Sequence, residues 1–243
     1  MQTINDRHYS LIIGAGSGIG GAVIQRLARE QPGDGILAVS RAPLALPASV
    51  QQFVCDYSEA GIDHLVREMA PMQGWIRQLV ISTGILHTDA IKPEKRAEEL
   101  NMSNMLEVLR INSVMPAYWL MSLLNILRGE EPCRVFVLSA RVGSISDNHK
   151  GGWYSYRASK AALNMVIKTA AIEYARRAPN VKLVAFHPGT VDTNLSKPFQ
   201  RNVPEDKLFD VDFVASKLLS LATTLPIDGE ASYLDWAGKP ISW

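Results

Sequence analysis

The chain has 243 residues, of which 47% are hydrophobic and 20% charged, and its 25 lysine and arginine side chains nearly balance 24 aspartates and glutamates. This composition excludes an intrinsically disordered chain, and the balanced charge excludes a bulk attraction to nucleic acid or to an anionic membrane. A single α/β domain of this length buries a large core, so the length requires no second domain.

Short apolar runs alternate along the chain with segments of helical periodicity. The runs that we predict to be strands cover residues 9–13, 36–40, 53–55, 79–82, 135–139, 181–186 and 232–234. Between them, Ile62, Leu65 and Met69 share one helical face, and residues 213–221 follow a similar rhythm. Continuous apolar strands joined by helices are typical of a parallel sheet covered on both faces. We therefore predict a doubly wound α/β sheet of about seven strands, in a single domain over residues 1–243.

A glycine-rich turn, Gly14-Ala15-Gly16-Ser17-Gly18-Ile19-Gly20-Gly21, joins the first predicted strand to the following helical run. Glycines let backbone N–H groups approach a pyrophosphate, and the helix N-terminus supplies partial positive charge. Two registers compete: Gly16, Gly18 and Gly21, or Gly14, Gly18 and Gly20. We prefer the second, because it starts the turn where the strand ends. The residues predicted to hold the pyrophosphate are Gly14, Ser17, Gly18, Ile19 and Gly20.

The end of the second predicted strand bears on which dinucleotide is bound. An acidic residue there would accept the ribose hydroxyls of NAD, but the sequence is Val39-Ser40-Arg41. The guanidinium of Arg41 suits a 2′-phosphate, although a solvated arginine at a strand end is the alternative. The sequence therefore favours NADP(H) over NAD(H).

The segment Trp153-Tyr154-Ser155-Tyr156-Arg157-Ala158-Ser159-Lys160 contains two tyrosines before a lysine. Residues four apart share a helical face, so Tyr156 and Lys160 point into one site, whereas Tyr154 faces elsewhere. A free phenol has a pKa of about 10 and needs a neighbouring cation to become a proton shuttle at neutral pH. Tyr156 is accordingly the predicted proton donor and acceptor, with Lys160 lowering its pKa.

The glycine turn combined with Tyr-x-x-x-Lys resembles the short-chain dehydrogenase/reductase family over nearly the whole chain. The segments 139–148, 156–164 and 187–193 resemble the branch of C-factor and sniffer-type carbonyl reductases. The resemblance implies a Rossmann fold and an NADP(H)-dependent enzyme that interconverts a carbonyl and an alcohol by hydride transfer. It also implies a homodimer or homotetramer, and a bond from Lys160 to the nicotinamide ribose.

Further positions match the family's pattern in chain order. The resemblance implies that Asn112 belongs to the catalytic set and holds a water. It implies cofactor contacts by Asp56, Ser82, Thr83, Gly84, Pro188, Gly189, Val191 and Thr193. Plainer roles exist for several of them: Asp56 as a helix cap, Asn112 as a satisfied buried amide and Pro188-Gly189 as a turn.

One position departs from the family, which places a catalytic serine second in a Ser-Ser-x-x-Gly segment. Here that position is Ala140, whose methyl group cannot bond a substrate oxygen. Ser139 is our choice for the missing serine's role, although a regular strand would point it to the opposite side; Ser144 is the alternative. The substitution also opens a second hypothesis, an NADPH-binding sensor or signalling protein with weak or no turnover.

Few features of the sequence concern the cellular location and the partners of the protein. Cys55 and Cys133 lack metal-ligand or framework spacing, the five histidines lack ligand spacing, and residues 1–7 contain no signal-peptide run. We expect a cytoplasmic protein without a metal, acting on a small-molecule carbonyl or alcohol. Residues 194–210 are expected to form a mobile substrate loop, with Ile85, His87, Trp153 and Tyr154 around the same pocket.

Overall fold

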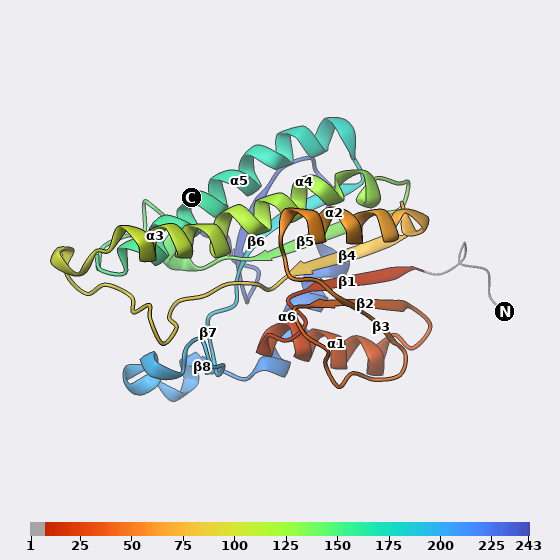
Figure 1. The fold of residues 1–243 in the computed structure, drawn as a ribbon. Coiled ribbons are helices and arrows are strands. Elements are labelled where there is room, and N and C mark those ends of the chain that lie inside the picture. The colour runs from red at the N-terminus through yellow and green to blue at the C-terminus, as the bar shows by residue number, and fades with distance from the viewer. Residues whose placement is uncertain (1–7) are drawn as a thin grey trace.

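The computed structural model describes residues 8–243 and contains one central sheet of seven parallel strands (Figure 1). The strand order is β3-β2-β1-β4-β5-β6-β9. The strands are β1 Tyr9–Ile13, β2 Gly35–Ser40, β3 Val50–Val54, β4 Ile76–Ile81, β5 Cys133–Leu138, β6 Val181–His187 and β9 Ser232–Asp235. The predicted doubly wound sheet is confirmed. Because the order reverses between β1 and β4, ligands are expected beyond the carboxyl ends of these strands.

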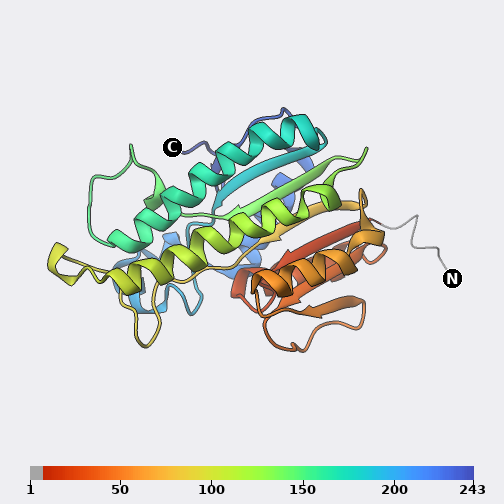
Figure 2. The same cartoon turned by 45° about the horizontal axis from the view of Figure 1, so that its top comes forward.

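Helices cover both faces of the sheet (Figures 1 and 2). On one face, α1 contacts α6; on the other, α4 contacts both α2 and α5. The helices are α1 Gly18–Glu30, α2 Glu59–Glu68, α3 Met102–Leu109, α4 Met115–Leu127, α5 Tyr154–Arg177 and α6 Val211–Thr224. Between α3 and α4, the chain winds as a π-helix over Arg110–Val114.

Successive side chains of the central strands enter two different cores, which explains why these strands contain apolar runs without alternation. In β1, Leu11 packs into the core that contains Trp119 of α4, whereas Ile12 packs into the core that contains Val23 of α1 and Leu218 of α6. All five side chains are fully buried.

The structure departs from the predicted elements in segments that are short or polar. Strand β3 starts at Val50 rather than at residue 53, because Gln51 and Gln52 occupy an edge strand and hide the apolar pattern. The two-residue strands β7 Thr190–Val191 and β8 Leu208–Phe209 pair outside the main sheet. Between them, the predicted substrate loop contains two 3-10 helices, Lys197–Asn202 and Glu205–Lys207.

Two further observations concern membrane-spanning and signal segments. None of the helices within residues 8–243 is both long and apolar enough to span a bilayer. Residues 1–7, on which the expectation of no signal peptide rests, lie outside the described residues.

Candidate active site

The glycine turn leaves β1 and enters α1 with its backbone held by a set of short hydrogen bonds. Ser17 caps α1, its Oγ accepting from the N–H of Gly20 at 2.9 Å. Ser17 Oγ also donates to Ser82 Oγ at 3.0 Å, and Ser82 Oγ donates to the carbonyl of Gly14 at 3.0 Å. The turn is therefore fixed against the end of β4 before any ligand arrives.

Steric limits in the turn distinguish the two glycine registers. A Cβ at Gly14, which has φ +87°, would lie 2.9 Å from Ser82 Oγ; one at Gly18 would lie 2.9 Å from the methyl of Thr193. At Gly20 it would meet the carbonyl of Gly14 at 2.6 Å. At Gly16 and Gly21 the nearest atoms are 3.6 Å away, an ordinary contact. The close approaches fall on the preferred register.

A cavity of about 350 Å³ opens between the glycine turn and the ends of β2 and β3. Arg41 and Asp56 both line it. Arg41 is exposed and has no ion pair among residues 8–243, so its charge is available to a ligand. The Asp56 carboxylate accepts from the N–H of Ser58 at 2.9 Å and from its Oγ at 2.7 Å, and these bonds lower the pKa of Asp56. Asp56 thus helps form the turn before α2 while also lining the cavity.

A second cavity of about 1090 Å³ adjoins the first, and Gly16, Ser17, Thr83 and Gly84 line both. Thr83 Oγ1 is buried without a hydrogen-bond partner within residues 8–243, so it can serve a ligand. The other predicted cofactor residues in this wall are Gly18, Ile19, Ser82, Pro188, Gly189, Val191 and Thr193. Gly189 has φ +79°, and a Cβ there would lie 2.6 Å from the ring of Phe209.

Tyr156 lies in the wall of the larger cavity, in the first turn of α5. Its side chain is buried against Leu86 and Ala140, and this burial raises the pKa of its phenol. Apolar packing orients the ring, and Tyr156 forms part of the cavity wall. The arrangement stabilises the protonated phenol, the form that donates a proton.

Lys160 lies one turn further along α5 and lines the same cavity. Its Nζ donates to the carbonyl of Leu138 at 2.8 Å and lies 5.9 Å from the centroid of the Tyr156 ring. Burial lowers the pKa of Lys160 to about 8. The predicted sharing of one helical face by Tyr156 and Lys160 is seen, whereas the lowering of the tyrosine pKa by this lysine stays a prediction.

Asn112 occupies the π-helical segment between α3 and α4 and is completely buried. Pro116, four residues later, has no N–H to give to the carbonyl of Asn112, which favours the wider winding. The Asn112 amide oxygen accepts from the N–H of Ile85 at 2.7 Å, and its nitrogen donates to Ile85 O at 2.8 Å and Ser159 Oγ at 3.0 Å. The side chain therefore ties the loop after β4 to α5. This arrangement is that of a satisfied buried amide, the plainer of the two roles considered for Asn112.

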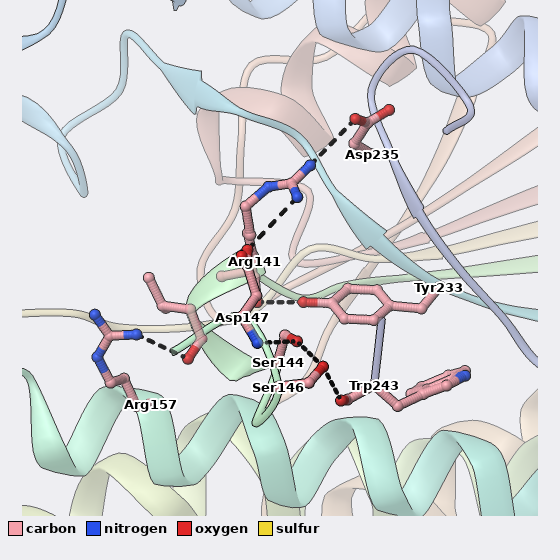
Figure 3. Close-up of polar contacts among 10 residues, drawn as sticks. Arg141, Ser144, Ser146, Asp147, Arg157, Tyr233, Asp235 and Trp243 are labelled. Atoms are coloured by element: carbon pink, nitrogen blue, oxygen red, sulfur yellow. Dashed lines mark hydrogen bonds and ion pairs between the residues drawn. The ribbon is translucent and has the colours of Figure 1, made fainter. Parts of the chain in front are cut away.

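Ser139 lines the larger cavity together with Tyr156, but both candidate serines are engaged in other hydrogen bonds. Ser139 Oγ donates to Asn164 Oδ1 at 2.6 Å, and Ser144 Oγ accepts from the N–H of Asp147 at 3.2 Å. The extended backbone of Ala140, with φ −152° and ψ 142°, sends its methyl to the side of Tyr156, opposite Ser139. Its carbonyl accepts from the hydroxyl of Tyr233 at 2.6 Å (Figure 3). The geometry disfavours Ser139 as the missing hydroxyl.

Of the residues expected around the substrate, some line a cavity and others do not. Trp153 and Phe199 line the larger cavity, and Ile85 lines the smaller one. Tyr154 is 42% exposed and lines neither cavity, because it starts α5 on the outer face. His87 contacts the ring of Phe199 from the edge, with centroids 5.7 Å apart.

His187 ends β6 in the wall of the larger cavity, where the sequence analysis assigned it no role. Its Nδ1 is buried without a hydrogen-bond partner among the described residues. Burial, followed by the charge of Arg141, lowers the pKa of His187 to about 4. The imidazole is therefore neutral near pH 7.

This depressed pKa predicts a loss of stability in acid. Between about pH 6.5 and pH 4, His187 binds a proton in the unfolded chain but not in the folded protein. The free energy of unfolding therefore falls as the pH falls. At pH 5 the loss from this group is about 2 kcal/mol. Urea unfolding at pH 7.5 and pH 5 should show a smaller loss in His187→Gln than in the wild type. The exposed His64→Gln serves as control; equal losses in all three proteins would contradict the prediction.

Some residues of this site escaped sequence reasoning because their partners are distant in the chain. The hydroxyl of Tyr57 accepts from the N–H of Gly14 and donates to the carbonyl of Val39, both at 3.1 Å. Glu94 is buried at the start of α5. A glutamate between Pro93 and Lys95 in a loop gives no local signal for such a position.

Comparisons with known proteins agree with this geometry. A family model described as short chain dehydrogenase matches residues 9–204. C-signal of Myxococcus xanthus is 27% identical over 145 residues, which are 60% of this chain and 82% of that protein. A 1-hydroxy-2-glutathionyl-2-methyl-3-butene dehydrogenase of Rhodococcus sp. (strain AD45) is 44% identical over 69 residues, 28% of this chain and 30% of that enzyme. This match thus spans under a third of the Rhodococcus protein.

Solved structures share the fold over nearly the full length. The carbonyl reductase Sniffer of D. melanogaster has a TM-score of 0.83 at 21% identity, covering 98% of this chain and 100% of that chain. The NADPH-bound carbonyl reductase from chicken fatty liver has a TM-score of 0.82 at 23% identity with the same coverage. At these identities the likeness establishes the fold.

Proposed function

Because the chain belongs to the short-chain dehydrogenase/reductase family, we propose that it is an NADPH-dependent oxidoreductase that interconverts a carbonyl and an alcohol. The resemblance to the C-factor and sniffer-type branch, seen in the sequence, is confirmed by the likeness to C-signal and to Sniffer. The observation that carries the proposal is the placement of Tyr156 and Lys160 in one wall of the cavity into which the glycine turn opens.

The residues present fit a dinucleotide. The turn has no room for side chains at Gly14, Gly18 and Gly20, Thr83 Oγ1 is a buried hydroxyl without a partner in the described chain, and Arg41 is unpaired there. We assign the pyrophosphate to the turn, and the nicotinamide end to the Pro188 to Thr193 wall.

In the proposed reaction, Tyr156 donates its phenolic proton to the carbonyl oxygen of the substrate. NADPH, when bound, supplies the hydride for the carbonyl carbon. Lys160 keeps a positive charge near the phenolate that results, and Asn112 orients the loop after β4 against α5. In the reverse direction, Tyr156 takes the proton of an alcohol.

The preference for NADPH rests on Arg41 at the smaller cavity. Replacing Arg41 by Ala should raise the dissociation constant of NADPH about 10- to 100-fold, the scale of a charge-assisted hydrogen bond, and change that of NADH little. Titration of both cofactors by fluorescence gives the two constants. An equal loss of affinity for both cofactors would remove the 2′-phosphate from this position.

The activity is tested by following NADPH consumption while the protein is offered a panel of aldehydes, ketones and quinones. Oxidation of the cofactor that depends on the carbonyl supports the proposal. Ala140 favours a second candidate, an NADPH-binding sensor or signalling protein. Tight NADPH binding without consumption in the presence of any carbonyl supports that candidate, and no binding of either cofactor refutes both.

We also retain the expected homodimer or homotetramer in the cytoplasm. Met121 of α4 and Met165 and Ile172 of α5 are exposed on adjacent helices, which supports a contact with a second copy. The thiols of Cys55 and Cys133 are free and buried, which agrees with a reducing compartment. Light scattering measures the oligomeric state directly.

A further inference from the structure

The entry to α5 is built from three consecutive residues in the left-handed region. Gly151, Gly152 and Trp153 have φ values of 63°, 65° and 52°. Glycine adopts this conformation readily, but tryptophan rarely does. Trp153 and Tyr57 are the only non-glycine residues within 8–243 that have positive φ. Such outliers persist where the surroundings enforce them, often at functional sites.

Glu94 holds the entry to α5 through both its backbone carbonyl and its buried carboxylate. Glu94 is 3% exposed, and its backbone carbonyl accepts from the N–H of Trp153 at 2.5 Å. The Glu94 carboxylate accepts from the N–H of Ser155 at 3.2 Å and also from the hydroxyl of Ser155. The side chain of Trp153 caps no helical N–H of α5, so Glu94 supplies that cap from 61 residues away.

Arg157 holds the two glycines from the other side. Its Nε donates to the carbonyl of Gly152 at 2.9 Å, and its Nη2 donates to the carbonyl of Gly151 at 3.0 Å. Its Nη1 donates to the carbonyl of Val142, which lies in the same loop as Ala140 (Figure 3). The strained turn is thus fixed to both the loop after β4 and the loop after β5.

The result is an aromatic wall beside the proton donor. The Trp153 ring meets the Tyr156 ring from the edge, with centroids 6.1 Å apart, and meets the ring of Phe199 with centroids 5.1 Å apart. His87 Nε2 lies 3.1 Å from the carbonyl oxygen of Asn194, which ties the Phe199 loop down. Leu86, Ala140, Val142 and Leu195 contribute apolar side chains around Tyr156.

We propose that Trp153 and Phe199, whose rings pack against each other, form one side of the cavity next to Tyr156, and that this aromatic slot selects carbonyl compounds with a flat ring attached to the carbonyl carbon. Glu94 is the positioning residue that keeps Trp153 in this slot. The slot rests on the proposed function, since it names the substrate class for the Tyr156 site. An aromatic substrate ring gains edge and face contacts with both side chains that a saturated ring of the same carbon number does not.

Two ketones that differ only in the ring test the slot. Acetophenone and cyclohexyl methyl ketone have the same carbon skeleton, but only the first ring is flat and aromatic. The wild type should favour acetophenone about tenfold in kcat/KM, the scale of one or two aromatic contacts. Trp153→Ala and Phe199→Ala should each lower this ratio about tenfold relative to the wild type. Tyr154→Ala, next to Trp153 but outside both cavities, should keep it.

The role of Glu94 is tested by the same ratio. Glu94→Ala should lower the preference for acetophenone toward that of Trp153→Ala, whereas Glu94→Gln, which still accepts a hydrogen bond, should restore most of it. Glu98→Ala removes an exposed charge from the same loop and serves as control. If Glu94→Ala lowers the melting temperature and slows both ketones equally, Glu94 only stabilises α5 and its positioning role is wrong.

A binding measurement separates failure of the slot from failure of the enzyme. Dissociation constants of 1-phenylethanol and 1-cyclohexylethanol are measured by calorimetry with NADP⁺ present. If no ketone is reduced but 1-phenylethanol binds about tenfold more tightly in a Trp153-dependent manner, the slot stands and the oxidoreductase proposal falls. If both ketones are reduced with equal kcat/KM, the slot is overturned and the enzyme stands. No turnover and no binding preference overturns both.

Discussion

Replacing Tyr156 by Phe is expected to lower kcat for carbonyl reduction roughly 10²- to 10⁴-fold, the contribution of a positioned general acid. The substitution removes one oxygen and leaves the ring that packs against Leu86, Ala140 and Trp153. The glycine turn and Arg41 are untouched, so the dissociation constant of NADPH should change little. Steady-state kinetics with NADPH and a reducible carbonyl, together with a fluorescence titration of the cofactor, measure both quantities.

A tyrosine on the same helix provides the control for this variant. Tyr154→Phe removes the same hydroxyl two residues earlier, from a side chain that lines neither cavity, and should leave kcat unchanged. Turnover by Tyr156→Phe at the wild-type rate would exclude Tyr156 as the proton donor. A large loss of NADPH affinity would instead show that the hydroxyl belongs to the cofactor site.

The fold was predictable because its signals are local. In β5, Val135 and Val137 enter one core and Phe136 the other, so residues 135–138 form a continuous apolar run that is typical of a buried parallel strand. The pairing of Tyr156 with Lys160 is local too, since it follows from helical spacing alone. The doubly wound sheet, the turn and this pair were therefore within reach of the sequence.

The rest of the site depends on contacts between distant segments. Glu94 reaches Ser155 across 61 residues, and Tyr57 reaches Gly14 across 43. A glutamate in a loop and a tyrosine after a strand carry no periodic signal that would pair them with these partners. The left-handed conformation of Trp153 is equally invisible, because only the tertiary contacts of Glu94 and Arg157 enforce it.

The replacement of the family's catalytic serine was predictable from the sequence only in part. Regular extension of β5 placed Ser139 and the residue after it on opposite sides, and the structure has Ser139 facing Asn164 and Ala140 facing Tyr156. The sequence could show the missing hydroxyl, but not that both Ser139 and Ser144 are already engaged elsewhere. In the proposed reaction, the substrate oxygen would therefore meet Tyr156 beside the methyl group of Ala140.

This geometry predicts that Ala140→Ser gains activity. The new Oγ would stand on the Cβ that already faces Tyr156, and the backbone of residue 140 is held by the hydroxyl of Tyr233. A second donor to the developing oxyanion is worth roughly 10²- to 10³-fold in kcat when it is well placed. We therefore expect kcat for ketone reduction to rise by about 10²-fold with NADPH affinity unchanged.

Ser139→Ala distinguishes the sources of catalysis. If Ser139 Oγ only supports Asn164, its loss should lower the melting temperature and leave kcat close to that of the wild type. If instead Ser139→Ala abolishes turnover and Ala140→Ser adds nothing, then Ser139 carries the serine's role after a local rearrangement. If Ala140→Ser turns an inert NADPH-binding protein into a reductase, the native chain is the sensor and Ala140 is the residue that silences it.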